Sequence, residues 1–363
     1  HMKLQRVLAG VLALTAQLGF AQQALREKPL GLKLPTDNNK LYGSDPQLFY
    51  MYTYRNFEGK TSKPWTAGKY GYVRTLRRTG EGVIATKFHE GIDIRPVKRD
   101  AAGRPLDLIY AIADGKVVHT SKVAGNSNYG RYIVMEHDWG SGKFYSLYAH
   151  LDTVVCNVGQ KVKSGSTIAK MGYTGAGINR ERAHLHLELN VMTHTDFSYF
   201  HREYFGSKNH HKKYNGLNMN GLNIAELFLR HHKNPRISLT NFISKVPVYF
   251  KVTVPRKGPI DIATRYDWMR KGDHTKASPS WEISFASSGF PLAVTPSMRR
   301  VTKPTVTFVK PTKSNHMYHT KKLLSGEGSS ASLTKLGLRT IALVAGTFSR
   351  VEPAPPVAIP VED

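Results

Sequence analysis

The chain has 363 residues, of which 40% are hydrophobic and 21% charged; this is ordinary for a globular protein and long enough for two domains. Its 52 Lys plus Arg against 26 Asp plus Glu give a formal net charge of +26, which favours polyanionic partners: nucleic acid, anionic lipid head groups or acidic envelope polymers. A single cysteine excludes an internal disulfide, and the β-rich run TVVCNVG predicts that Cys156 is buried rather than a nucleophile.

The N-terminus has the pattern of a secretory signal peptide over residues 1–21. A basic start precedes a mostly apolar stretch over residues 7–20, and the small residues Gly19 and Ala21 precede the expected cleavage site. An amphipathic helix packed on the body and an uncleaved anchor are the alternatives. No later segment is apolar enough for a transmembrane helix in the mature chain. We therefore expect an exported protein, in the periplasm, outside the cell or at the cell wall.

The next segments predict an arm followed by a β domain. Residues 22–82 begin as a polar arm and become aromatic-rich, which predicts packing against the domain that follows. Residues 83–195 hold a dense series of short strands separated by turn signals, in AIADGKVVHTSK, GRYIVMEHD, GKFYSLYAHL and STIAKMGYTG. This density of strands predicts a mainly β fold with an antiparallel sheet.

The second half of the chain changes in composition twice. Residues 196–235 predict a polar loop and then a short helix, IAELFLRHH, capped by Asn223. Residues 236–350 return to a strand pattern in VPVYFKVTV, SWEISFAS, PTVTFV and LRTIALVAG, which predicts a β-rich accessory module whose role no motif indicates. Residues 351–363, VEPAPPVAIPVED, predict a Pro-rich tail.

The stretch AHLHLELN, residues 183–190, alternates strictly and predicts a strand. Its Ala and Leu side chains share one face, which suits a core, while His184, His186 and Glu188 share the other. Two imidazoles two residues apart on a strand lie about 7 Å from each other. They are surface residues, packed and satisfied histidines, or parts of a metal site.

Two further segments carry polar groups suited to a metal. In KFHEGIDIRP, His89 and Asp93 project to one side of an extended segment, and imidazole with carboxylate suits Zn²⁺. His150 follows a strand in YSLYAHLD. Each of these features, taken singly, is more often structural. The remaining histidines, including His119 and the adjacent pair His210–His211, show no partner in the sequence, and we expect the pair to lie in a basic loop.

Together and in this order, the three segments resemble the lysostaphin/LytM-type zinc metalloendopeptidases, whose pattern is His-x-x-x-Asp, Tyr-x-His-Leu and His-x-His. The connecting text HEGIDI, ADGKVV, NYGRYIVMEH, VGQKVKSGSTIAKMGYTG and HLHLEL also resembles that family, over residues 83–195. The resemblance implies a peptidase domain with an open groove and one Zn²⁺ per chain held by His89, Asp93 and His186. It also implies an open position for water beside a catalytic pair, His150 and His184, whose division of roles stays open.

The chain departs from the family at one position. Many relatives carry a tyrosine six residues before the first ligand histidine, placed to assist at the oxyanion, whereas this chain has Val83. The alternatives are Tyr70, Tyr72 and Tyr173. Latent relatives fill the open zinc position with an upstream asparagine. The upstream asparagines here are Asn38, Asn39 and Asn56, and nothing marks any of them as that plug.

The leading hypothesis is an exported zinc metalloendopeptidase that hydrolyses peptide cross-links or stem peptides of bacterial peptidoglycan, with peptidoglycan and anionic envelope polymers as partners. Whether the bond is Gly–Gly or D-Ala–diaminopimelate stays open. The alternative is a catalytically silent domain that binds the cell wall or activates another hydrolase. Such relatives usually lose one or more of the five key residues, and this chain keeps all five. Nucleic-acid binding is not expected, because no helix-turn-helix, zinc-finger spacing or aromatic RNA platform occurs.

Overall fold

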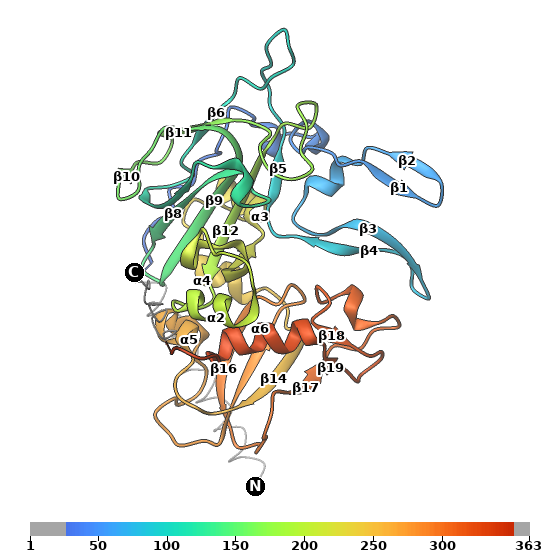
Figure 1. Cartoon of the computed structure of the whole chain (residues 1–363), viewed down its shortest axis with the longest axis vertical. Helices are drawn as coiled ribbons and strands as arrows, with labels where there is room; N and C mark the ends of the chain where they lie inside the picture. Colours follow the sequence, from blue (N-terminus) through green and yellow to red (C-terminus); the bar gives the residue numbers. More distant parts are fainter. Residues whose placement is uncertain (1–26, 352–363) are drawn as a thin grey trace, which may run out of the picture.

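The computed structural model describes residues 27–351. The signal peptide expected at residues 1–21 lies outside this range, as does nearly all of the expected tail over residues 351–363. Figure 1 shows an upper sheet and a lower C-terminal part, with a hairpin extending to one side. Within residues 27–351, no helix has the length and apolar character needed to cross a membrane.

A nine-stranded sheet, in which every pairing is antiparallel, forms the centre of the molecule. Its main order is β10-β7-β8-β9-β11-β6, and β12 pairs with β9, β5 and β13. The strands are β5 (Ile92–Ile94), β6 (Leu108–Tyr110), β7 (Gly115–Ser121), β8 (Arg131–Asp138), β9 (Lys143–Val154), β10 (Lys161–Val162), β11 (Thr167–Met171), β12 (Leu185–Met192) and β13 (Met219–Leu222). The predicted mainly β, antiparallel fold is confirmed.

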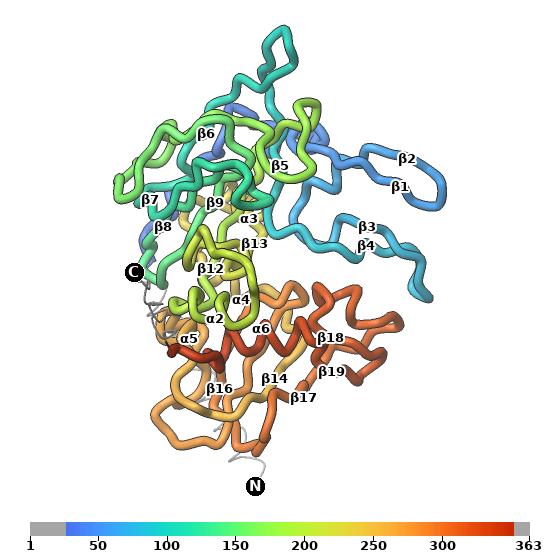
Figure 2. Tube along the Cα trace, in the orientation of Figure 1, coloured from blue at the N-terminus to red at the C-terminus, as the bar shows by residue number. Residues whose placement is uncertain are grey.

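Two hairpins precede this sheet in the chain. The first joins β1 (Arg55–Phe57) to β2 (Lys60–Ser62), and the second joins β3 (Gly71–Thr79) to β4 (Gly82–His89). Figure 2 traces the second hairpin away from the sheet and back again, so that the chain returns to the sheet at the end of β4. His89, the last residue of β4, therefore lies where the chain returns to the central sheet.

Three helices follow β12: α2 (Phe197–Tyr204), α3 (Ile224–Lys233) and α4 (Leu239–Ser244). The predicted cap of α3 is confirmed, because the Asn223 side chain accepts a hydrogen bond from the backbone N–H of Glu226. Helix α2 lies where a polar loop was expected. It forms because Phe197 and Phe200 are buried against α6 (Lys335–Ala345), and this burial outweighs the polar composition of the segment.

The C-terminal part contains a four-stranded antiparallel sheet of order β16-β15-β14-β17 and a short β18–β19 pair. The elements are β14 (Phe250–Pro255), α5 (Asp261–Arg265), β15 (Ser280–Phe285), β16 (Pro291–Ser297), β17 (Thr305–Val309), β18 (Leu324–Ser325), β19 (Ser332–Leu333) and α6 (Lys335–Ala345). The predicted strand LRTIALVAG is wrong, since it lies in α6. Thr334 caps this helix, Gly346 ends it at φ 68°, and Ile341 and Val344 are buried three residues apart, as on one helical face.

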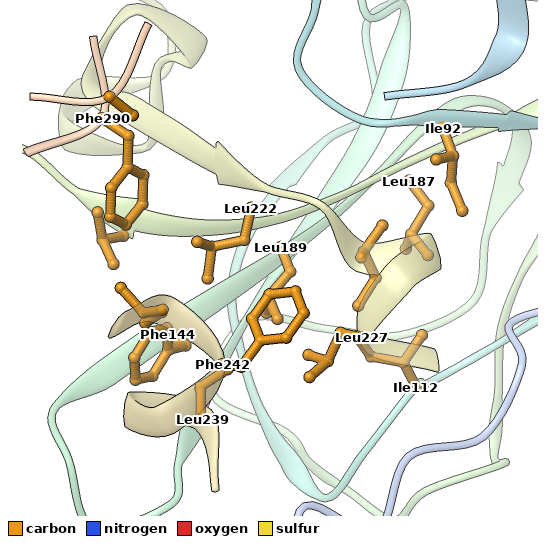
Figure 3. Close-up of a cluster of buried hydrophobic side chains, with 14 of the residues drawn as sticks. Ile92, Ile112, Phe144, Leu187, Leu189, Leu222, Leu227, Leu239, Phe242 and Phe290 are labelled. Carbon is orange, nitrogen blue, oxygen red and sulfur yellow. The ribbon is translucent and has the colours of Figure 1, made fainter. Parts of the chain in front are cut away.

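One hydrophobic cluster extends from the central sheet into the C-terminal part. Leu185, Leu187 and Leu189 of β12 are fully buried, as the alternation predicted. Figure 3 shows Leu222 of β13 and Phe290, which precedes β16, among the side chains of this one cluster. The central sheet and the C-terminal part bury their apolar side chains in the same cluster. The C-terminal part therefore packs directly on the sheet that carries the candidate site.

Candidate metal centre

Strand pairing brings His89, Asp93 and His186 together. Asp93 in β5 lies directly opposite His186 in β12. His89 ends β4, and the chain bends at Glu90 and Gly91 instead of continuing as one extended segment. A Cβ at Gly91 would lie 2.2 Å from the Leu187 carbonyl oxygen, so only glycine allows this approach. Each of the three residues offers one ligand atom, and these atoms lie within 4.8 Å of one another.

Hydrogen bonds on the outer sides of the two histidines fix which nitrogen faces the centre. His89 Nδ1–H donates to the Lys69 carbonyl over 2.8 Å, and His186 Nε2–H donates to Glu188 Oε1 over 2.8 Å. His89 Nε2 and His186 Nδ1 therefore face each other at 3.0 Å, and Asp93 Oδ1 lies 3.1 and 2.9 Å from them. Two imidazole nitrogens and a carboxylate oxygen that converge in this way fit Zn²⁺, which would take the place of the proton on His186 Nδ1.

The electrostatics of the centre favour a cation. Burial alone would lower the pKa of His186, but hydrogen bonds to Asp93 and Glu188 outweigh it and raise that pKa to about 9. Burial would raise the pKa of Asp93, yet His89, His184 and Arg74 together hold it well below its usual range. Asp93 is therefore an anion, and the site around it stabilises positive charge.

Arg74 of β3 engages the second oxygen of this aspartate. Its guanidinium forms an ion pair with Asp93 Oδ2, and its Nε–H donates to the Ala67 carbonyl over 2.9 Å. Because Oδ2 is occupied by Arg74, Oδ1 is the oxygen directed at the two histidines. This arrangement suits a carboxylate that binds a metal through one oxygen.

His150 and His184 lie beside the three candidate ligands. Their ring centroids are 4.9 Å apart, and the His150 ring lies 5.8 Å from that of His186. His150 Nδ1–H donates to the Thr174 carbonyl over 2.8 Å, and His184 Nδ1–H donates to the Arg182 carbonyl over 2.6 Å. The Nδ1 hydrogen bond turns His150 Nε2 away from the Thr174 carbonyl, whereas His184 Nε2 lies 3.4 Å from Asp93 Oδ1, the oxygen that also faces His89 and His186.

The backbone of His150 is held in a conformation that L-residues rarely adopt. Its φ is 62°, although it lies within β9. Gly175 packs against its ring, and a Cβ there would lie 3.1 Å from His150 Nδ1. Burial, followed by the neighbouring His184 and His186, lowers the pKa of His150 well below its ordinary value, so its imidazole is neutral. Backbone strain of this kind is concentrated at functional sites.

The structure thus brings all five sequence-predicted residues into one buried cluster, none of them more than 8% exposed. His89 and His186 also line a cavity of about 880 Å³, which gives the cluster access to solvent. The one position at which the sequence departs from the family pattern, Val83, lies outside this cluster. Val83 is 44% exposed near the start of β4, away from His89 at its other end.

Tyr70, Tyr72 and Asn38, three of the alternatives considered for the oxyanion tyrosine and the asparagine plug, direct their polar groups at backbone carbonyls away from the centre. The Tyr70 and Tyr72 hydroxyls donate to the carbonyls of Gly221 and Ser287 over 2.8 and 3.0 Å. Asn38 is buried, and its side chain donates to the carbonyls of Leu48 and Arg95. The polar groups of these three residues therefore hold backbone segments in place.

Three neighbours of the centre were missed in the sequence: Arg74, Tyr129 and Glu188. The Tyr129 ring lies 5.7 Å from that of His186, and its hydroxyl donates to Glu188 Oε1 over 2.7 Å. Glu188 shares a strand face with both histidines of β12, so the alternation signalled its position. No motif in the sequence signalled Arg74, and Tyr129 lies in the family-like segment NYGRYIVMEH but had no role assigned, because each contacts the centre from another strand or loop.

Comparison with known proteins gives a consistent family. Residues 87–197 match the model of peptidase family M23. Murein hydrolase activator NlpD of Escherichia coli K12 is 36% identical over 125 residues, which is 32% of this chain and 28% of that protein. Lipoprotein NlpD of Yersinia enterocolitica is 36% identical over 90 residues, covering 25% of this chain and 84% of that sequence. A zinc-containing peptidase from Vibrio cholerae aligns with 28% identity and a TM-score of 0.24, over 39% of this chain and 36% of that one.

Proposed function

This chain belongs to peptidase family M23, and on that premise we propose that it is an exported zinc endopeptidase acting on the peptides of bacterial peptidoglycan. The observation that carries the proposal is the convergence of five residues, two histidines and an aspartate with ligand atoms facing inward and two more histidines beside them. The net charge of +26 suits an anionic envelope polymer as a weak docking partner.

His89, Asp93 and His186 would hold the zinc ion. When bound, zinc supplies Lewis acidity toward a carbonyl oxygen and lowers the pKa of a bound water to about 7. Glu188 accepts the outer N–H of His186 and Arg74 occupies the outer oxygen of Asp93, so both ligands keep their orientation.

The proton transfers fall to His150 and His184 in this proposal. Both donate Nδ1–H to a backbone carbonyl, so Nε2 is the atom that accepts the proton of the attacking water and returns it to the leaving amine. His150 is neutral because of burial, which is the protonation state that a general base requires. The other histidine of the pair then stabilises the developing oxyanion charge.

A second candidate function comes from the names of the relatives. The Escherichia coli relative is a murein hydrolase activator, and the match spans 28% of its length. A catalytically silent domain that activates another hydrolase is therefore the alternative. The retention of all five residues favours the enzyme, because a silent domain has no need to keep a proton-transfer pair with fixed tautomers.

The experiment combines metal analysis with digestion of purified sacculi. We expect about one zinc per chain, and mass analysis of released muropeptides from sacculi of different cross-link chemistry identifies the bond cleaved. His186→Ala is expected to abolish zinc content and cleavage, while His119→Gln, a histidine outside the centre, leaves both unchanged. Cleavage retained by His186→Ala would falsify the site. Full zinc loading without cleavage of any sacculus would favour the silent alternative.

A further inference from the structure

The C-terminal part of the chain forms part of the lining of the cavity beside the metal centre. This lining includes His89 and His186 of the centre and Leu336, Arg339 and Leu343 of α6. Figure 1 shows α6 running along the boundary between the C-terminal strands and the upper part of the molecule. The C-terminal part therefore forms one side of the space through which a substrate reaches the centre.

The charges that line this cavity are unbalanced. Its cationic side chains are Lys87, Lys208, Lys321 and Arg339. Lys321 forms an ion pair with Glu90, whereas the other three have no ion-pair partner within residues 27–351. The second carboxylate of the cavity, Glu188, is engaged by His186 and Tyr129. The lining therefore presents three uncompensated positive charges.

Arg339 is placed to bind an anion. Its guanidinium lies over the Phe205 ring, 4.9 Å from the ring centroid. Stacking on an aromatic ring restricts the guanidinium plane and leaves its N–H donors at the edge, where they match a carboxylate in bidentate geometry. Because Arg339 comes from α6 and Phe205 from the segment after α2, this anchor exists only when the two parts of the chain are packed together.

The wall formed by the C-terminal part is firmly attached. The Tyr72 hydroxyl donates to the Ser287 carbonyl over 3.0 Å and accepts the backbone N–H of Lys321 over 2.8 Å. The cavity also has apolar lining from Phe88, Phe200 and the exposed Leu217. Its volume of about 880 Å³ falls in the range of about 300–1,000 Å³ typical of sites for small ligands, and a nucleic-acid duplex does not fit.

We propose that this cavity binds a carboxylate-bearing segment of the peptide that is cleaved at the metal centre, so that the C-terminal part of the chain supplies substrate specificity. This proposal rests on the peptidase function proposed above. Arg339, Lys208 and Lys87 bind the free carboxylate, and the apolar lining packs against the aliphatic part of the same peptide. Peptides whose carboxylate is blocked as an amide lose the attraction.

The test measures binding separately from cleavage. The probes are L-Ala-γ-D-Glu-L-Lys-D-Ala amide with the D-Glu α-carboxyl group either free or amidated. Isothermal titration on the full chain is done in EDTA, which prevents turnover. We expect the free acid to bind about fivefold more tightly than the amide, and high salt to reduce this preference.

Two variants and one matched control make the test specific. Arg339→Gln and Lys208→Gln are expected to remove the preference for the free acid. Lys335→Gln removes one positive charge from the same helix outside the cavity and is expected to keep it. Thermal unfolding of each variant confirms that it is folded.

Equal binding of both peptides, or an undiminished preference in both variants, would overturn the proposal, and so would stronger binding of inorganic polyphosphate than of the acidic peptide. Failure of the peptidase function is seen separately, as zinc-loaded protein that cleaves no sacculus while the binding preference persists.

Discussion

Two pairs of histidines in this molecule have nearly the same geometry and opposite character. His89 Nε2 and His186 Nδ1 lie 3.0 Å apart, and His119 Nε2 and His211 Nδ1 lie 3.2 Å apart. In the first pair the outer nitrogens donate to a carbonyl and a carboxylate, and Asp93 lies between the rings. The second pair has no carboxylate, so one imidazole N–H simply donates to the other ring.

The difference shows in the pKa values. Asp93 and Glu188 raise the pKa of His186 to about 9 in spite of burial, whereas burial and the neighbouring His211 lower the pKa of His119 to about 4. Proximity of two imidazoles therefore does not define a metal site. What distinguishes the candidate centre is the carboxylate that stabilises a cation and the outer hydrogen bonds that direct one nitrogen of each ring inward.

Removing that carboxylate is the change with the largest expected effect. Asp93→Asn keeps the side-chain volume but removes the negative charge and leaves Arg74 without its partner. We expect the zinc affinity to fall by more than about 100-fold, since a metal ligand is lost as well as a charge. Competition with a zinc chelator measures this affinity. A variant that binds zinc as tightly as the wild type would show that the carboxylate does not distinguish the two pairs.

Neutralising the outer partner of His186 sharpens the comparison with a smaller effect. Glu188→Gln retains an acceptor near His186 Nε2 but removes the charge that raises the basicity of the ring. The expected loss of zinc affinity is about 10- to 100-fold, the range found for such supporting carboxylates. The control is Glu226→Gln on the exposed side of α3, which we expect to leave the affinity unchanged. Equal affinities in both variants would assign Glu188 to packing alone.

The sequence alone predicts part of this centre. The alternation of AHLHLELN predicted both the buried leucines and the polar face of β12, because a strand has a period of two residues. The order of the three motifs predicted that His89, Asp93, His150, His184 and His186 form one site. The positions of Arg74, Tyr129 and Arg339 depend on pairing between distant segments, which no local pattern records. The predicted strand at LRTIALVAG was wrong because a cap at Thr334 and burial at helical spacing outweighed its β-branched residues.

The smallest expected effect tests the second pair through pH. The pKa of His119 falls from 6.5 to about 4 on folding, because of burial and then His211, so between these values the unfolded chain binds more protons than the folded one. His119 therefore costs no stability above pH 6.5 and destabilises the fold progressively as the pH falls from 6.5 toward 4. After a discount for solvent screening, we expect about 1–2 kcal/mol of this loss to disappear in His119→Gln. Urea unfolding at pH 7, 5.5 and 4.5 measures it, with the exposed His232→Gln as control. Identical pH profiles for wild type and His119→Gln would mean that the second pair, like the first, tolerates a positive charge.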